Sequence, residues 1–244
     1  MQTELGRPAF YALRRGGWRD LVTLLHPPYT AWHLSYVALG AAAAPHVHAG
    51  RLGAALAAFF LAVGVSAHAL DELHGRPLDT ALSRRTLLAL AVSGLIGAVA
   101  IGVVGCLIVS PWVAPLVAVG AFLVVAYNLE LAGGRFHNDQ WFAAAWGAFP
   151  AFTGYFSNAL AVRPAGILVA AACWLLSAAQ RRLSTPAREL RRRTVEVRGT
   201  QTLRDGRRLE LDKGRLTAPL EGALSSMWLA LVLLAVGFLA VRGL

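Results

Sequence analysis

Acidic, basic and imidazole side chains gather in residues 66–79, at the end of a long apolar run. His68 precedes Asp71 by three residues and Glu72 by four, so the three side chains share one face of a helix. Ionisable groups within membrane-type helices are costly to bury and are functional candidates by default. Carboxylate oxygens suit Mg²⁺, and arginines such as Arg76 bind phosphate oxygens directly. The segment therefore predicts a site for a phosphorylated substrate.

Similar side chains stand at the ends of later apolar runs. One run closes with Tyr127 and Asn128, and the next opens just after Arg135 and Asp139. If these ends meet on one side of a bundle, their carboxylates and guanidinium groups converge. The residues that we expect to bind substrate there are His68, Arg76, Asn128, Arg135, Trp146, Arg181 and Arg182.

Two other interpretations of the first segment stay open. Asp71 and Glu72 could simply meet lipid headgroups and pair with Arg76. Alternatively, a transition metal could be held by His68, Asp71, His74 and His137, although the spacing of the first three is not a specific metal signature.

The composition indicates what positions these residues. Of the 244 residues, 57% are hydrophobic and 15% are charged, and the mean hydropathy is +0.55. A soluble domain of this length needs more polar surface. Apolar runs near the roughly 20 residues that cross a bilayer must pair their backbone groups internally, as helices do. We predict an all-α polytopic membrane protein, a bundle of about seven transmembrane helices at residues 30–47, 52–70, 87–109, 112–129, 141–157, 164–180 and 223–241.

The basic residues indicate the orientation of the chain. With the N-terminus inside, all 23 lysines and arginines except Arg51, Arg163 and Arg242 fall on the inner side. The positive-inside rule then predicts a multi-pass protein of the cell (inner) membrane with a cytoplasmic N-terminus. This rule and attraction to anionic membrane lipids account for the net charge of +10, so nucleic acid is not an expected partner. The oligomeric state is left open.

The chain divides into two parts. Residues 1–28 are expected to form a cytoplasmic interfacial segment that includes an amphipathic helix. Residues 29–244 are expected to form a single transmembrane helical domain. A cytoplasmic loop, residues 181–221, is inserted before the last helix.

A small β-hairpin is expected within that loop, near residues 194–212. Residues 194–198 and 208–212 alternate between polar and apolar side chains, as strands do. Asp205 and Gly206 between them are a typical hairpin turn.

The segment around Asp71 resembles the UbiA superfamily of intramembrane prenyltransferases. That family carries an N-D-x-x-D-x-x-x-D motif at the inner end of its second helix, followed by R-P-L before the third. Here His68-x-x-Asp71 occupies the first half of the motif, and residues 76–78 read Arg-Pro-Leu. Tyr127 at the end of a helix and the glycine, proline and Gly-Tyr of residues 146–155 also match the family pattern.

The chain also differs from the family. Ala67 and His68 stand where the family has Asn-Asp, and about seven helices replace the family's nine. The family's second motif, D-x-x-x-D after helix six, is replaced by Gln-Arg-Arg-Leu-Ser at residues 180–184.

The resemblance implies a UbiA-like transferase that acts on an isoprenoid pyrophosphate, or a related lipid, at the cytoplasmic face. Mg²⁺ is the implied cofactor. Tyr127, with Trp141 and Trp146, would shield a developing allylic cation. We expect Asp71, Tyr127 and Asp139 to be catalytic, and Asp71, Glu72 and Asp139 to hold the metal.

Two alternatives remain from the sequence. The missing second motif favours a catalytically altered UbiA-like scaffold that binds a lipid or assembles a membrane complex. A transporter is less favoured, because the sequence has no pair of interrupted helices in matching halves.

Overall fold

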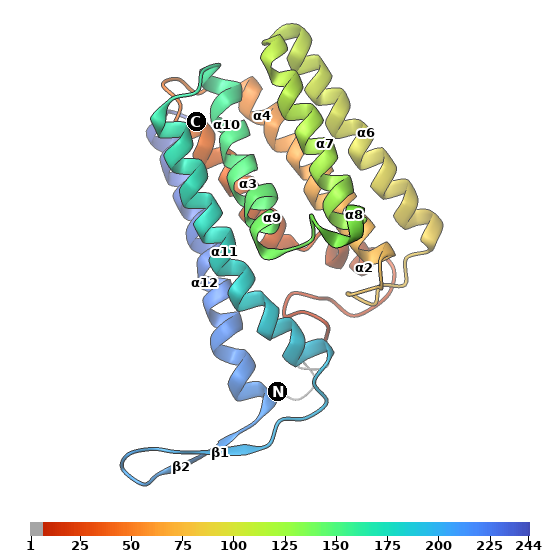
Figure 1. The fold of residues 1–244 in the computed structure, drawn as a ribbon, viewed down its shortest axis with the longest axis vertical. Coiled ribbons are helices and arrows are strands. Elements are labelled where there is room, and N and C mark those ends of the chain that lie inside the picture. Colours follow the sequence, from red (N-terminus) through yellow and green to blue (C-terminus); the bar gives the residue numbers. More distant parts are fainter. Residues whose placement is uncertain (1–6) are drawn as a thin grey trace.

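A computed structural model describes residues 7–244, which are mainly helical (Figure 1). Within these residues, five helical spans are long and apolar enough to cross a membrane. The chain is therefore a multi-pass membrane protein. The spans are Ala49–Leu73, Arg84–Ile108, Pro111–Asn128, Pro164–Arg192 and Lys213–Val241.

The five spans lie on two sides of the molecule. The first three form one side, and the last two pack along each other on the opposite side (Figure 1). Their elements are α4 (Ala49–Phe59), the π-helical η1 (Phe60–Ala67), α5 (His68–Leu73), α6 (Arg84–Ile108), the 3₁₀ turn η2 (Pro111–Val113), α7 (Ala114–Asn128), α11 (Pro164–Arg192) and α12 (Lys213–Val241).

Two further helical segments lie between these sides. One is α3 (Pro27–Ala42), and the other runs without a break through α9 (Asp139–Ala143), the π-helical η3 (Ala144–Ala148) and α10 (Phe149–Ala159). The 16 residues of α3 rise only about 24 Å, less than the hydrocarbon thickness of about 30 Å. Most α3 side chains are buried in protein. That these two segments also cross the membrane, which would give seven spans, stays a prediction.

The first helix of the bundle begins earlier than expected. Pro27 and Pro28 occupy the first turn of α3, where a missing N–H costs nothing, so they start the helix instead of ending the preceding one. Before them, α2 (Trp18–Leu24) is the only helix of the described N-terminal segment, and residues 1–6 lie outside the described part. The change of direction falls at His26, whose φ is 45°.

The centre of the bundle depends on the close approach of α3 and α10. A Cβ added at Gly40 would lie 1.9 Å from the carbonyl oxygen of Ala151, and one added at Gly154 would lie 2.1 Å from that of Val37. Only glycine leaves room for backbones this close, as in other membrane helix pairs. The contact anchors α10 and, through η3, the Trp146 side chain at the middle of the molecule.

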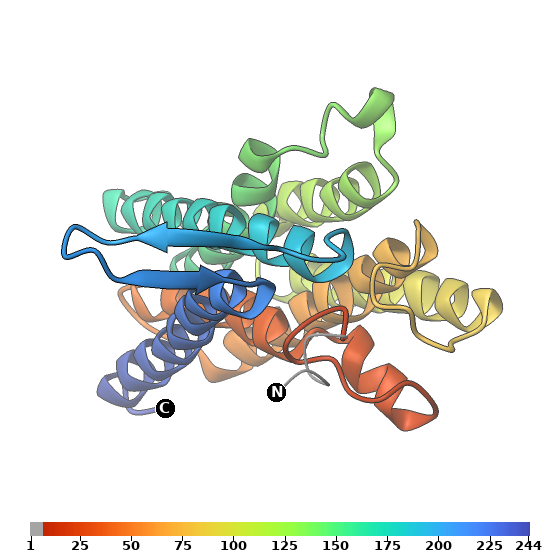
Figure 2. The same cartoon turned by 90° about the horizontal axis from the view of Figure 1, so that it is seen from below.

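The predicted β-hairpin is confirmed, with its first strand shifted. β1 (Gly199–Thr202) pairs antiparallel with β2 (Arg208–Leu211), and Gly206 in the turn has a φ of +81°. Figure 2 shows the hairpin across the ends of α11 and α12. Both helices continue into the region expected to be a loop, so residues 193–212 alone connect them.

We predict that Gly154→Ala lowers the stability of the protein, because the added methyl group forces α3 and α10 apart. Overpacking of this kind costs about 1–3 kcal/mol. The matched control is Gly237→Ala, whose added methyl group meets nothing within 4 Å. Thermal unfolding in detergent, followed by tryptophan fluorescence, measures both. Equal midpoints for the two variants would contradict the close contact.

Candidate functional site

Asp71 lies in the last turn of α5 with its side chain half-buried. Its carboxylate makes no hydrogen bond or ion pair with any described residue. The basic groups that act on it most strongly are Arg192 and Arg188 of α11, followed by His137 from the loop after α7. The Asp71 oxygens are therefore available to a ligand, in a region where three elements meet.

Glu72, the next residue, closes the loop that follows α5. Its side chain is fully buried. One carboxylate oxygen accepts a hydrogen bond from the Leu78 backbone N–H at 2.9 Å, and the other accepts from the N–H and hydroxyl of Thr80, also at 2.9 Å. Both oxygens are thus occupied by the chain itself, and a metal could reach them only if the loop opened.

Arg76 contributes to the same loop. Its guanidinium donates to the carbonyl of Thr80 at 3.0 Å and to that of Leu82 at 2.8 Å. Among the described residues it forms no ion pair with Asp71 or Glu72, which the sequence had left open. Both bonds use Nη1, which leaves the Nη2 and Nε donors of this exposed side chain for other acceptors, so phosphate binding by Arg76 stays a prediction.

His68 packs against a residue that sequence reasoning missed. Its ring stacks on that of His26, with centroids 4.1 Å apart and planes 12° apart. The Nδ1 of His26 lies 2.9 Å from the Tyr11 hydroxyl, while its Nε2 is buried without a partner among the described residues. Burial lowers the pKa of His26 well below its usual range, with help from His68, and raises that of Tyr11. The N-terminal segment therefore covers this side of the site with neutral groups.

Tyr127 connects the polar end of the bundle to its apolar interior. Its ring stacks on His137 at 4.4 Å between centroids, and the His137 Nδ1–H donates to the Tyr127 carbonyl at 3.0 Å. On its other side, Tyr127 meets the edge of Trp146 at 5.5 Å. Glu130 lies 3.8 Å from His137 and 4.0 Å from His74. His74 thus faces Glu130 rather than a shared metal with His68.

Asp139 is already paired. Its carboxylate accepts a 2.9 Å hydrogen bond from the Arg181 Nε–H, and this guanidinium lies 5.1 Å from the centre of the Phe142 ring. The Asp139 side chain is 71% exposed, against 16% for Arg181. Asp139 therefore lies at the rim of the site, whereas Asp71 is further inside.

Three other predicted residues contribute less directly. Asn128 is buried and donates to the Val124 carbonyl of its own helix at 2.8 Å. Arg135 and Arg182 are exposed. Their role in binding substrate stays a prediction.

Arg188 and Arg192 are the basic residues that the structure adds to the site. They follow Arg181 by seven and eleven residues, which places all three on one side of a helix with 3.6 residues per turn. This spacing was the signal in the sequence, but its use required α11 to continue beyond the apolar run. We call the following residues the polar cluster: Tyr11, His26, Tyr29, His68, Asp71, Tyr127, His137, Arg181, Arg188 and Arg192.

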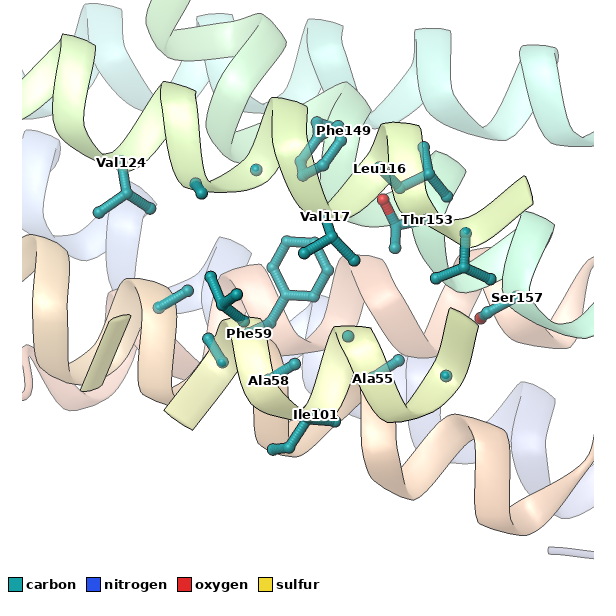
Figure 3. A pocket seen from close by; sticks show the side chains of 18 of the residues that line it. Ala55, Ala58, Phe59, Ile101, Leu116, Val117, Val124, Phe149, Thr153 and Ser157 are labelled. Atoms are coloured by element: carbon teal, nitrogen blue, oxygen red, sulfur yellow. The ribbon is translucent and has the colours of Figure 1, made fainter. Parts of the chain in front are cut away.

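An apolar cavity of about 140 Å³ lies between α4, η1, α6, α7 and α10 (Figure 3). Phe59, Val117 and Phe149 line it, and Thr153 and Ser157 supply hydroxyl groups on the α10 side (Figure 3). Trp146 also lines this cavity. Because Trp146 contacts Tyr127, one pair of aromatic side chains links the polar cluster to the apolar cavity.

The donor groups do not fit a preformed magnesium site. Within residues 7–244, no three histidine, cysteine, aspartate or glutamate side chains are grouped so that they could hold a metal. Glu72 is occupied by its loop and Asp139 by Arg181, which leaves Asp71. A magnesium ion bound by one carboxylate depends on substrate phosphates and water for its other ligands.

Comparison of the chain with protein-family models, with curated proteins and with solved structures gave no significant match.

We predict that Glu72→Ala strongly destabilises the protein, because three hydrogen-bond donors of the loop lose their acceptor. The expected loss is roughly 3 kcal/mol. Glu210→Ala, an exposed carboxylate on β2, serves as the control and changes stability little. Thermal unfolding measures both variants. A Glu72→Ala protein as stable as the control would show that the loop does not depend on this carboxylate.

We also predict a loss of stability on acidification. Because the pKa of His26 is lower in the folded protein than its ordinary value of 6.5, the unfolded chain takes up a proton first as the pH falls. The contribution of neutral His26 to the free energy of unfolding is fully present above about pH 6.5 and is lost as the pH falls below it. His26→Asn should reduce the fall in the midpoint temperature of unfolding between pH 7.5 and 5.5. Asparagine is chosen because it tolerates the left-handed backbone at this position.

The control for this experiment is His46→Asn, which removes an exposed imidazole. This variant should keep the fall seen in the unmodified protein. If the unfolding midpoints of both variants fall by the same amount, His26 does not cause the acid sensitivity.

Proposed function

We propose that the protein is a UbiA-like intramembrane transferase that acts on an isoprenoid pyrophosphate at the cytoplasmic face of the cell membrane. The observation that carries the proposal is the contact of the polar cluster with the apolar cavity through Tyr127 and Trp146. A prenyl pyrophosphate has the matching division into an anionic head and an apolar tail. The cytoplasmic side and the inner membrane stay predictions from the distribution of basic residues.

The proposed reaction begins with cleavage of the allylic carbon–oxygen bond. The bonding electron pair leaves with pyrophosphate, and guanidinium groups of the polar cluster stabilise its charge. The allylic cation forms beside Tyr127 and Trp146, whose aromatic faces attract positive charge. A new bond to the acceptor then forms, and the acceptor loses a proton. Asp71, with no partner among the described residues, is placed to take it.

Mg²⁺ stays an expected cofactor from the family resemblance. Asp71 is the residue that would hold it, together with pyrophosphate and water, and the ion would neutralise charge on the leaving pyrophosphate. Glu72 and Asp139 are less suited to this role because their oxygens already accept hydrogen bonds.

One observation favours a lipid-binding scaffold as the second candidate. Of the acidic residues expected to hold the metal with Asp71, Glu72 is committed to the loop and Asp139 to Arg181, so these described residues do not form the paired carboxylate clusters of the family. A scaffold would retain the head and tail sites without turnover.

We predict that Asp71→Asn lowers steady-state pyrophosphate release from prenyl pyrophosphates by at least about 100-fold, the usual effect of losing a proton-transfer group, because each turnover is complete only when the acceptor has lost its proton. The assay uses the purified protein in nanodiscs with farnesyl or geranylgeranyl pyrophosphate and a lipid extract as the acceptor source. The matched control is Asp79→Asn, an exposed carboxylate on the loop after α5 that pairs with Arg15. This control should keep full activity.

The three outcomes separate the candidates. Pyrophosphate release that depends on Asp71 supports the transferase. Binding of the prenyl pyrophosphate without release supports the scaffold. Absence of both binding and release contradicts the proposal that this chain recognises isoprenoid pyrophosphates.

A further inference from the structure

Two guanidinium groups of the polar cluster have no carboxylate of residues 7–244 at contact distance. Arg181 pairs with Asp139, and Arg191 pairs with Glu221 at 2.7 Å. Arg188, by contrast, reaches only the Thr185 hydroxyl of its own helix, at 3.4 Å. Among the described residues, Arg188 and Arg192 have no carboxylate within 4 Å.

Arg192 is held by the N-terminal segment. Its Nε–H donates to the carbonyl of Pro8 at 3.1 Å, while the neighbouring Arg191 donates to the carbonyl of Arg7 at 3.3 Å. A neutral carbonyl is a weaker acceptor for a guanidinium than a charged oxygen is. The Arg192 side chain is therefore positioned but not neutralised by this contact.

The two arginines carry like charges. Arg188 is repelled by Arg181 and Arg192 and attracted by Asp71, and Arg192 also acts on Asp71. Tyr11, Tyr29 and His26 also lie in this region but add no negative charge while neutral. Two half-buried positive charges thus lie close enough to repel each other, and like charges at low dielectric repel more strongly than in water. An anion bound between them would remove this repulsion.

We propose that Arg188 and Arg192 bind the phosphate oxygens of the substrate directly, so that recognition of the headgroup does not require Mg²⁺. This inference rests on the proposed function and names how the substrate is held. Phosphate oxygens replace the Pro8 carbonyl at Arg192 and the Thr185 hydroxyl at Arg188. The exchange gives each guanidinium an anionic acceptor in place of a neutral one, which adds the attraction between opposite charges.

In this proposal, the arginines of α11 replace the family's second acidic motif. A carboxylate motif recruits metal ions, which then neutralise a pyrophosphate. Arginines on α11 supply positive charge without an ion, and a planar guanidinium can donate two parallel hydrogen bonds to a phosphate. The loss of the second acidic motif after the sixth apolar run and the extension of α11 are therefore explained together, because the extension brings Arg188 and Arg192 to the phosphate.

The test measures binding of geranylgeranyl pyrophosphate to the full-length protein in nanodiscs, in buffer with EDTA and then with Mg²⁺. We expect the dissociation constant in EDTA to lie within about threefold of that in Mg²⁺. Arg188→Gln and Arg192→Gln should each weaken binding by at least about tenfold, because each removes charged hydrogen bonds. The matched control is Arg193→Gln, which removes an exposed positive charge from the same helix end and should change binding little.

Further measurements identify what is recognised. Geranylgeraniol, which has the tail but no phosphate, should bind equally to the unmodified protein and to the Arg188→Gln variant. Inorganic pyrophosphate should compete if the headgroup alone is recognised, and dioleoyl phosphatidic acid should compete if any lipid phosphate suffices. Competition by either compound supports the phosphate site. If neither competes but binding still depends on Arg188, the site recognises the complete prenyl pyrophosphate.

The decisive outcomes differ from those of the proposed function. Binding that disappears in EDTA, or that is unchanged in both glutamine variants, overturns direct recognition while leaving the proposed transferase intact. No binding with or without Mg²⁺ overturns both. The EDTA measurement uses the unmodified protein, so it decides the matter even if a variant fails to fold.

Discussion

The close contact between α3 and α10 is the constraint on which the rest of the structure depends. Gly40 and Gly154 let the two backbones touch, and this places η3 against α3. The wider π-helical turn leaves the Trp146 carbonyl free to accept a 2.7 Å hydrogen bond from the His33 Nδ1–H. Trp146 is thereby fixed between Tyr127 and the apolar cavity. This contact therefore sets the position of the apolar cavity relative to the polar cluster.

The loop after α5 shows how neighbouring carboxylates acquire different roles. Successive residues of a helix point about 100° apart, so Asp71 and Glu72 cannot face the same surroundings. Glu72 turns into the loop and accepts three hydrogen bonds there. Arg76 closes the same loop from outside through two carbonyl groups. A fully hydrogen-bonded buried carboxylate rigidifies its surroundings, and this rigidity holds α5 and Asp71 in place.

Half-burial distinguishes Arg188 and Arg192 from the arginines of an ordinary basic membrane surface. Most cytoplasmic arginines of membrane proteins face headgroups or water, where counter-ions screen them. Here Arg188 and Arg192 lie half-buried beside Asp71 and beneath the N-terminal segment. Charges so placed require a partner from the protein or from a ligand. In the proposed function, an anionic headgroup is that partner, and the apolar cavity that Trp146 lines holds its tail.

Much of the architecture followed from the sequence alone. Dehydrated backbone must pair within each segment, so long apolar runs indicated membrane helices without knowledge of their neighbours. The Asp205-Gly206 turn likewise predicted the hairpin, because turn geometry is local. The tertiary structure decided the rest: that Glu72 closes a loop while Asp71 stays free, that Asp139 is taken by Arg181, and that Arg188 and Arg192 reach the site. Spacing along a helix shows which side chains share a face, but the partner of that face is set by packing between segments distant in the chain.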